Sequence, residues 1–353
     1  MLRPLIVGRR GTPDFEDAVA AYVFSATLAI QDITGLATSG VTASHVAKRL
    51  EGSAESRSML FGLSARSVPR TVGELGYPVM TSEDLLDIEA WVFVSLPLLE
   101  DLRVTEAHIT LDASIAPLPG EDTPAAPWEA ALSLLDDLAA ALVRPIRQVW
   151  VTTATGADAP AALRHHGYAP AFSETQAVFD VPRCEVACDV VDDMAFAASD
   201  LPCLRDVLTS SSRSYPRGGL IMDEVTWDEA RLRDAGARLL DRGGSQVTAL
   251  ARDRGGCVVG IAEVVHYDSD AASLCEVGLV YVLPSARKIG LGRTALSSAL
   301  AAARARWPEV ETGYLSYPSG DPAAEATAAR LGARPVSQTT AWQLPCTGDP
   351  ARP

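Results

Sequence analysis

The sequence predicts an α+β protein in which two similar copies of a mixed, mostly antiparallel sheet are flanked by helices. Two observations predict this fold class. Residues 148–182 repeat the pattern of residues 312–345: a strand, a glycine-containing turn, a short helix, and a last strand that ends at proline. An apolar strand at 274–282 also leads through a basic glycine loop into a helix. We therefore expect two domains, residues 1–182 and 183–353.

The first copy is expected to begin with helices between residues 14 and 50, where apolar residues recur at helical spacing. Runs rich in apolar and β-branched residues predict its strands. These strands are expected at 58–64, 90–96, 106–114 and 148–153. The segment 68–86 fits neither pattern, and a further helix is expected to begin near Pro127.

The second copy is expected to follow the same order, with helices at 200–210 and 227–240. Its strands are expected at 247–252, 257–266, 274–282 and 311–317. The helix after the glycine loop carries Leu296, Leu300 and Ala303 at helical spacing, which predicts one apolar face against the sheet.

The glycine loop has the composition of a phosphate-binding turn. Gly290 and Gly292 lack a Cβ, so the backbone can adopt positive φ and let phosphate oxygens approach its amides. Arg287, Lys288 and Arg293 add positive charge, and a helix N-terminus favours anions. The pattern Arg-x-x-Gly-x-Gly differs from the glycine motifs of dinucleotide-binding and nucleoside-triphosphate-binding proteins. We therefore expect the loop to hold the pyrophosphate of a phosphorylated cofactor.

This loop resembles the acetyl-CoA loop of the GCN5-related N-acetyltransferases (the GNAT family), which reads Gln/Arg-x-x-Gly-x-Gly/Ala after a strand ending in Val-x-Pro. Val282-Leu283-Pro284 and residues 287–292 match that phrase, and the segments at 321–324 and 330–333 resemble the family's closing Asn-x-x-Ala and Leu-Gly-Phe segments. The resemblance covers roughly residues 245–345 and implies a tandem GNAT fold with acetyl-CoA as co-substrate. The cofactor-binding residues that it implies are Val280, Tyr281, Val282, Arg287, Lys288, Ile289, Gly290, Leu291, Gly292, Arg293, Thr294 and Asp321.

Glu276 is the candidate general base. It is the one carboxylate in the apolar run 274–282, where a charge is costly unless it is paired or lies at a cleft. It precedes Arg287 by the same interval as the strand glutamate of the histone-acetylating branch, and this resemblance implies general-base work. A partly desolvated glutamate can accept the proton of an acceptor ammonium. The alternative is a solvated glutamate at the edge of a strand.

The family's usual general acid is missing. The tyrosine that many members carry in the helix after Asn-x-x-Ala falls here on Ala328. A thiol pKa near 8.5 keeps a thiolate within about 2 kcal/mol of its protonated form at neutral pH, so this loss costs about 10- to 100-fold in rate. Tyr317 is the candidate substitute, with Tyr314 and Ser316 on the same strand as alternatives.

The first copy differs from the second at the position of the glycine loop. Its connection at 115–124 contains prolines, which donate no backbone N–H, and the carboxylates Glu121 and Asp122, which repel phosphate. We therefore expect no acetyl-CoA there. The first copy is then a degenerate GNAT-like domain that supports the second copy and lines its acceptor cleft, or serves only as a structural mate.

The acceptor is expected to be a primary amine of a small molecule, acetylated by direct attack in the C-terminal domain. A net charge of −15 and the lack of a basic stripe argue against a nucleic-acid partner. Residues 214–222 and 227–232 resemble the acceptor-side segment of actinobacterial tandem acetyltransferases. Two alternatives remain: acetylation of a cysteinyl sugar, as in a mycothiol synthase, and a non-catalytic acyl-CoA-binding sensor.

The remaining expectations concern metals, thiols and location. The six cysteines show no zinc-binding spacing, so we expect reduced thiols and no metal. No apolar run reaches about 20 residues and the first ten residues lack a signal-peptide pattern. We expect a cytoplasmic enzyme without a membrane partner, either a monomer with an internal pair of copies or a homodimer.

Overall fold

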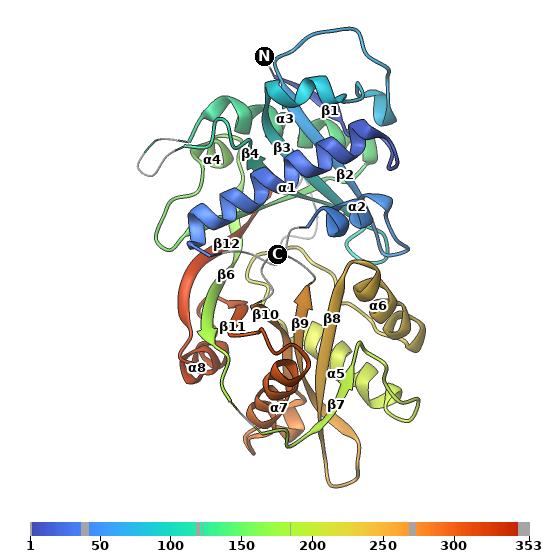
Figure 1. Ribbon diagram of the computed structural model, residues 1–353, viewed down its shortest axis with the longest axis vertical. Helices are drawn as coiled ribbons and strands as arrows, with labels where there is room; N and C mark the ends of the chain where they lie inside the picture. Colours follow the sequence, from blue (N-terminus) through green and yellow to red (C-terminus); the bar gives the residue numbers. More distant parts are fainter. Residues whose placement is uncertain are drawn as a thin grey trace.

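The computed structural model describes residues 2–36, 42–117, 121, 123–183, 185–267 and 273–344. It has two halves that stack along the long axis of the molecule, and each half contains most of one of the two copies (Figure 1). Helices lie on both faces of the sheet, which confirms the predicted α+β class.

The first copy contains the strands and helices expected from the sequence, together with a short first strand that was not predicted. Its elements are β1 (Arg3–Ile6), α1 (Pro13–Thr34), α2 (Ala43–Glu51), β2 (Ser56–Ser64), β3 (Ile88–Pro97), β4 (Val104–Leu111), α3 (Ala125–Leu142), β5 (Ile146–Ala154), α4 (Ala161–His165) and β6 (Ala169–Asp180). The ambiguous segment 68–86 holds the 3₁₀ turn η1 (Glu74–Gly76) and most of η2 (Ser82–Asp87).

The second copy repeats this order of elements. They are β7 (Asp189–Asp192), α5 (Leu201–Ser214), α6 (Glu229–Asp241), β8 (Gly244–Arg252), β9 (Val258–Tyr267), β10 (Leu274–Val282), η3 (Pro284–Ala286), α7 (Leu291–Arg306), β11 (Thr312–Pro318), α8 (Pro322–Arg330) and β12 (Arg334–Leu344).

The strands of the described residues form one twelve-stranded sheet rather than the two separate sheets expected. Its order is β1-β2-β3-β4-β5-β12-β6-β11-β10-β9-β8-β7. The sheet is continuous because the copies exchange their last strands: β12 pairs with β5, and β6 pairs with β11. The predicted division at residue 182 falls between β6 and β7 and stays a prediction, whereas the sheet runs through both copies.

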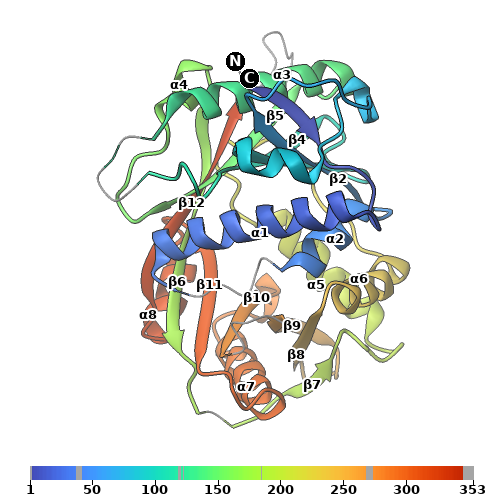
Figure 2. The ribbon, with the colours of Figure 1, turned by 45° about the horizontal axis from the view of Figure 1, so that its top comes forward.

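Each half has one apolar core on each face of its sheet. In the first half, α1 and α2 cover one face and α3 covers the other. In the second half, α5 and α6 cover one face, here called the α5 face, and α7 packs against the other, the α7 face. Helix α1 runs across the middle of the molecule (Figure 2).

Ion pairs fasten α6 to the first half. Arg231 lies 3.1 Å from Glu55 and also pairs with Glu100, and Arg238 lies 2.9 Å from Glu55. Because these side chains are mostly covered, the network is less screened by solvent than isolated surface pairs are. The first copy thus fixes the position of a helix that covers the α5 face.

One expectation about the thiols is wrong. Cys203 in α5 and Cys257 before β9 form a disulfide, although 54 residues separate them in the sequence. The fold places their Cα atoms 6.1 Å apart, within the range that a disulfide spans. Cys188 and Cys275 carry free thiols. No helix in the described part of the chain has the length and apolar character needed to cross a membrane.

Candidate functional site

The glycine loop adopts the left-handed backbone that its sequence suggested. Gly290 has φ 89° and is the N-cap of α7, and Lys288 has φ 71°. A lysine in this region is uncommon and strained, which is typical of functional turns. The amide of Thr294 donates to the Gly290 carbonyl at 3.0 Å and begins the helical ladder. The amides of residues 291–293 therefore precede the ladder and have no helical carbonyl partner.

The basic side chains of the loop lie around this helix start. The Nε of Arg287 donates to the Val282 carbonyl at 2.9 Å, and its guanidinium lies 5.3 Å from the centre of the Tyr281 ring. The Nη2 of Arg293 lies 4.0 Å from the place that a Cβ on Gly290 would occupy. Arg287 is thus anchored to the end of β10, with the rest of its guanidinium available to a ligand.

The other loop residues are arranged around the backbone. The side chain of Ile289 is exposed, and Leu291 packs against the core beneath α7. A Cβ on Gly292 would lie 3.3 Å from a methyl group of Val282, so glycine lets the helix start approach the strand closely.

Strands β10 and β11 pair at one end and then separate. Their parallel register runs from Leu274 opposite Thr312 to Val277 opposite Leu315 and stops there. A bulge in β10 between Val277 and Val280 follows at once. Beyond it, β10 continues along β9 and β11 continues along β6. We call the space between the separated strand ends the β10/β11 gap.

One edge of β10 faces this gap with backbone groups. The amide of Leu283 donates to the Val259 carbonyl of the neighbouring strand β9 at 2.8 Å. In an antiparallel ladder only alternate residues exchange such bonds, so Tyr281 also bonds toward β9 while Val280 and Val282 direct N–H and C=O the other way. The N–H and C=O of Val280 and the N–H of Val282 can therefore bind an extended ligand arm, since the Val282 carbonyl already accepts Arg287, whereas Tyr281 contributes its side chain elsewhere.

The C-terminal end of α5 bridges the two walls of the gap on the α5 face. The hydroxyl of Ser214 donates to the Tyr281 hydroxyl at 3.0 Å, which ties it to the β10 wall. The next residue, Tyr215, donates its hydroxyl to Glu174 of β6. Glu174 lies opposite Pro318 at the end of β11, the other wall. Consecutive residues of one helix end thus contact both walls.

Glu276 lies on the α5 face of β10. It pairs with Val265 of β9 on one side and with Tyr314 of β11 on the other. Paired residues project from the same face of a sheet, and so do residues two apart on one strand, which adds Tyr267 to this group. Burial and then the Glu276 charge raise the pKa of Tyr267. The candidate base therefore lies just before the strands separate.

Tyr317, the candidate acid, lies on the opposite α7 face. It packs with Val280 and Leu291 against the core beneath α7. Burial, with a smaller effect from Glu325, raises the pKa of the Tyr317 hydroxyl, so it remains a proton donor at neutral pH. Ala328, which takes the place of the usual tyrosine, is buried in the same core. The sheet therefore lies between the candidate base and the candidate acid.

Asp321 has a structural explanation. Its carboxylate caps α8 by accepting the amides of Ala323 at 2.8 Å and Ala324 at 3.2 Å. An N-cap of this kind stabilises a helix by about 1 kcal/mol. Its predicted contact with the cofactor stays a prediction.

The structure adds Glu263 of β9, which the sequence analysis missed. It lies two residues from Val265 and therefore on the α5 face with Glu276. Its Oε2 accepts the amide of Leu279 in the β10 bulge at 3.4 Å, and it lines a cavity of about 430 Å³ beneath α5 and α6. Burial raises the pKa of Glu263 to about 7. The sequence carries the same signal at 258–267 as at 274–282: one carboxylate in an apolar strand.

Replacing Glu263 with glutamine is expected to stabilise the protein at high pH. Burial raises the native pKa from 4.5 to about 7, so the folded state binds this proton more tightly and loses stability as pH rises through that interval. Glu263→Gln removes the penalty, which amounts to about 3 kcal/mol at pH 8 and under about 1 kcal/mol at pH 5. Urea unfolding at both pH values measures this difference. A gain that is the same at both pH values would contradict it, and Glu309→Gln on the surface is the control.

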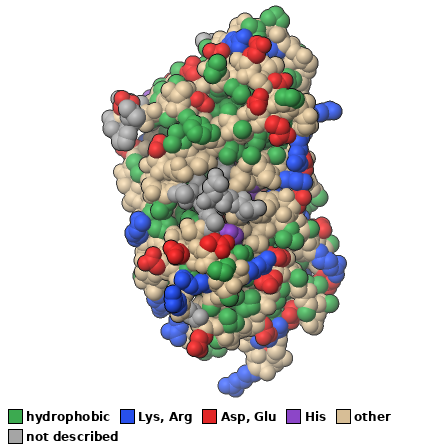
Figure 3. All heavy atoms as spheres, viewed as in Figure 1, with side chains coloured by type: hydrophobic (Ala, Val, Ile, Leu, Met, Phe, Trp, Pro, Cys, Tyr) green, Lys and Arg blue, Asp and Glu red, His purple; other side chains and the backbone are tan. Residues whose placement is uncertain are grey.

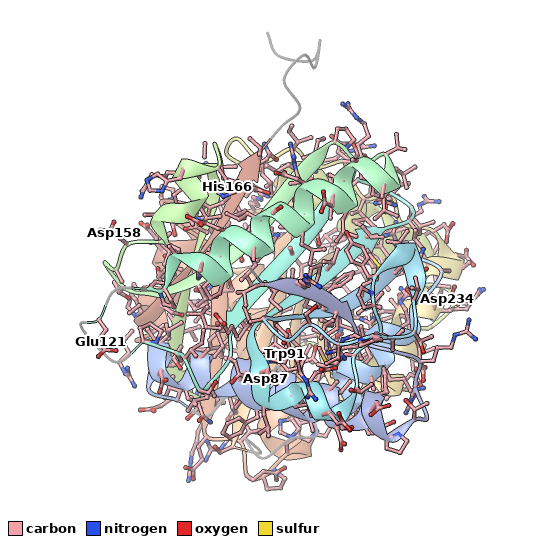
Figure 4. The ribbon with its side chains drawn as sticks, turned by 90° about the horizontal axis from the view of Figure 1, so that it is seen from above. Asp87, Trp91, Glu121, Asp158, His166 and Asp234 are labelled. Atoms are coloured by element: carbon pink, nitrogen blue, oxygen red, sulfur yellow. A yellow bond between two sulfur atoms is a disulfide. The ribbon has the colours of Figure 1, made fainter. Side chains whose placement is uncertain are left out.

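The first copy repeats part of this arrangement without the loop. Glu106 pairs with Gln148 at the third position of the parallel β4–β5 register, as Glu276 does with Tyr314. After β4, however, the indole N–H of Trp91 donates to the Asp112 carboxylate at 3.2 Å. Trp91 is labelled in Figure 4. Helix α3 begins after its N-cap residue Pro124, and no side chain caps its first amides. The absence of acetyl-CoA here stays a prediction, and Asp122 lies outside the described residues.

Acidic and basic side chains are interspersed on the face drawn in Figure 3. In the parts of the chain that the structure describes, no three His, Cys, Asp or Glu residues are grouped so as to hold a metal ion.

Comparisons with known proteins agree with this geometry. Residues 206–333 match the sequence model of the acetyltransferase (GNAT) family. The chain is similar to the structure of a tandem GNAT protein from the clavulanic acid biosynthesis pathway, with a TM-score of 0.66, 14% identity, and coverage of 99% of this chain and 100% of that one. It is also similar to a GCN5-related N-acetyltransferase from Sphaerobacter thermophilus, with a TM-score of 0.56, 14% identity, and coverage of 97% and 96%. At such identity these likenesses show the fold. No curated protein matches the chain in sequence.

Proposed function

Since the C-terminal part of this chain is a GNAT domain and the whole chain has the tandem GNAT fold, we propose that it transfers an acetyl group from acetyl-CoA to a primary amine of a small molecule. One observation carries the proposal: the free edge of β10 at Val280 and Val282 leads directly to the helix start at Gly290. An extended arm and a terminal pyrophosphate can therefore bind to one continuous stretch of backbone.

The residues of the loop fit coenzyme A. Unpaired amides and three cations suit its pyrophosphate, and the strand edge suits the amide groups of its pantetheine arm. Bound acetyl-CoA supplies the activated acetyl group. The protein's own contributions are to orient the acceptor, to move protons and to exclude water from the β10/β11 gap.

Proton acceptance is assigned to Glu276. An ammonium group must lose a proton before its nitrogen can attack an acyl carbonyl, and a carboxylate on the α5 face is placed to accept it directly or through water. Glu263 on the same face is a second carboxylate, with its pKa raised to about 7 by burial, that can relay or accept the proton. Tyr317 on the α7 face is assigned to protonate the departing thiolate, which leaves as the thiol of coenzyme A.

Thiol release from acetyl-CoA tests the proposal. The purified chain is incubated with acetyl-CoA and a panel of primary amines that includes amino acids, arylalkylamines, amino sugars and a cysteinyl sugar. We expect amine-dependent release for at least one class, with the N-acetyl product seen by mass spectrometry. Tight acetyl-CoA binding without turnover on any member would instead support a non-catalytic sensor. Turnover confined to the cysteinyl sugar would support the mycothiol-synthase alternative.

A further inference from the structure

A second cavity, here called the aromatic cavity, lies between the two copies beside the loop that follows α5. Its volume is about 230 Å³. Strands β5 and β6 of the first copy provide one side, and the residues after α5 provide the other. The side chains that line it include Trp150, Phe172, Glu174, Tyr215, Leu220 and Met222.

Three aromatic rings form its walls. The rings of Trp150 and Phe172 lie 6.5 Å apart at 80°, and those of Phe172 and Tyr215 lie 5.8 Å apart at 61°. Steeply inclined rings present both faces and edges to the enclosed space, and ring faces attract cations as well as apolar groups. Leu220 completes the apolar lining and is itself buried.

The one carboxylate of the cavity is Glu174. It accepts the Tyr215 hydroxyl and, at 3.1 Å, the Ser316 hydroxyl. Neither partner carries a positive charge, and no ion pair to Glu174 occurs among the described residues. Arg217 also lines the cavity, but its guanidinium donates to the carbonyls of Met222 at 2.9 Å and Ser212 at 2.8 Å. The terminal nitrogens of Arg217 are thus used by carbonyls, whereas Glu174 has only hydroxyl partners in the described chain and can still pair with a positive charge. Together with three aromatic rings, this carboxylate favours a cationic occupant.

The cavity opens beside the reaction path proposed above. Ser316 belongs to the part of β11 that has separated from β10, on the same face as Tyr314 and Glu276. Glu276 lies opposite Tyr314, and Glu174 accepts the hydroxyl of Ser316, two residues further along β11. Burial, and then the charges of Glu276 and Glu174, raise the pKa of Tyr314. A cation held by Glu174 is therefore near the candidate base and the β10/β11 gap.

We propose that the aromatic cavity selects the acceptor: it binds a primary organic ammonium with a compact apolar body, a single ring or a short branched chain, whose charge Glu174 holds. The assignment rests on the proposed acetyl transfer and narrows its acceptor class to arylalkylamines and branched alkylamines. The two carboxylates near Tyr314 would repel an acceptor that bears its own carboxylate, so free amino acids are poor ligands. The first copy thus contributes substrate specificity through Trp150, Phe172 and Glu174.

Three ligands of one shape and different charge test the assignment without acetyl-CoA. They are 2-phenylethylamine, 2-phenylethanol and phenylacetate, titrated by calorimetry into the full chain. We expect the amine to bind at least about 10-fold more tightly than the alcohol, and phenylacetate not to bind. Equal affinity for amine and alcohol, or tight binding of phenylacetate, would overturn the assignment.

Two variants separate the contribution of the Glu174 charge to ligand affinity from that of the aromatic rings. Glu174→Gln is expected to weaken the amine about 10-fold and leave the alcohol unchanged, while Phe172→Leu weakens both. Unchanged amine affinity in Glu174→Gln contradicts the role of this carboxylate. Glu309→Gln on the surface is the matched charge control, and thermal unfolding verifies that each variant is folded.

The same ligands and variants distinguish an error in the cavity assignment from an error in the proposed acetyl transfer. If other amines are acetylated while 2-phenylethylamine neither binds nor reacts, the cavity assignment is wrong and acetyl transfer stands. If 2-phenylethylamine binds as described, with the expected loss in Glu174→Gln, but no amine is acetylated, the cavity stands as an ammonium site and the transfer reaction is wrong.

Discussion

Glu276→Gln is expected to lower kcat for amine acetylation about 10²- to 10⁴-fold, while the affinity for acetyl-CoA stays within about twofold. Glutamine keeps the size of the side chain but cannot accept a proton, and proton transfer by a positioned base contributes about this factor. Binding is preserved because Glu276 lies where β10 and β11 still pair, before the free strand edge and the glycine loop. Steady-state thiol release and calorimetry measure the two quantities.

The first copy provides a matched control. Glu106 occupies the same register position, third in the parallel strand pair, but no glycine loop follows its strand. Glu106→Gln is therefore expected to retain wild-type turnover. If Glu276→Gln keeps its activity while Glu263→Gln loses it, Glu263 is the base. If Glu106→Gln is the variant that loses activity, the second copy is not the catalytic one.

Gly290→Asp is expected to weaken acetyl-CoA binding by at least about 30-fold. Gly290 has φ 89°, where a side chain costs about 1 to 2 kcal/mol, and the new carboxylate would stand beside the amides proposed to hold the pyrophosphate. Like charges a few ångströms apart near a protein surface repel by about 2 to 3 kcal/mol. Calorimetric titration with acetyl-CoA measures the loss.

Gly156→Asp serves as the control that distinguishes the effect of backbone strain at positive φ from the effect of the new carboxylate on pyrophosphate binding. Gly156 has φ 81°, and like Gly290 it meets no close neighbour that a Cβ would strike, but it lies in the turn after β5 of the first copy. It should lose a similar amount of stability and keep full affinity for acetyl-CoA. Equal affinity losses in both variants would mean that the Gly290 effect is an indirect consequence of destabilisation.

The sequence predicted the local parts of the site and missed those that depend on distant pairing. The glycine loop and Glu276 are visible because a turn and an interrupted apolar run are properties of contiguous residues. The exchange of β6 and β12 is not visible, because each last strand carries the same alternating pattern whichever copy it pairs with. Two separate sheets were expected for this reason.

The aromatic cavity and the disulfide show the same limit. Trp150, Phe172 and Tyr215 come from β5, β6 and the end of α5, and only the stacking of the two copies brings them together. Cys203 and Cys257 are 54 residues apart in the sequence, and only the fold brings them within the range of a disulfide. Glu263 is different: its signal was local and identical in kind to that of Glu276, so it could have been predicted.

The most direct test of the central claim is the stoichiometry of coenzyme binding. We propose one pyrophosphate site per chain, at the amides that precede α7, and none in the first copy. Calorimetric titration of the wild-type chain with acetyl-CoA is therefore expected to give one site per chain, and acetyl-pantetheine, which lacks the pyrophosphate, should bind far more weakly. No detectable binding, two sites per chain, or equal affinity for acetyl-pantetheine would contradict it.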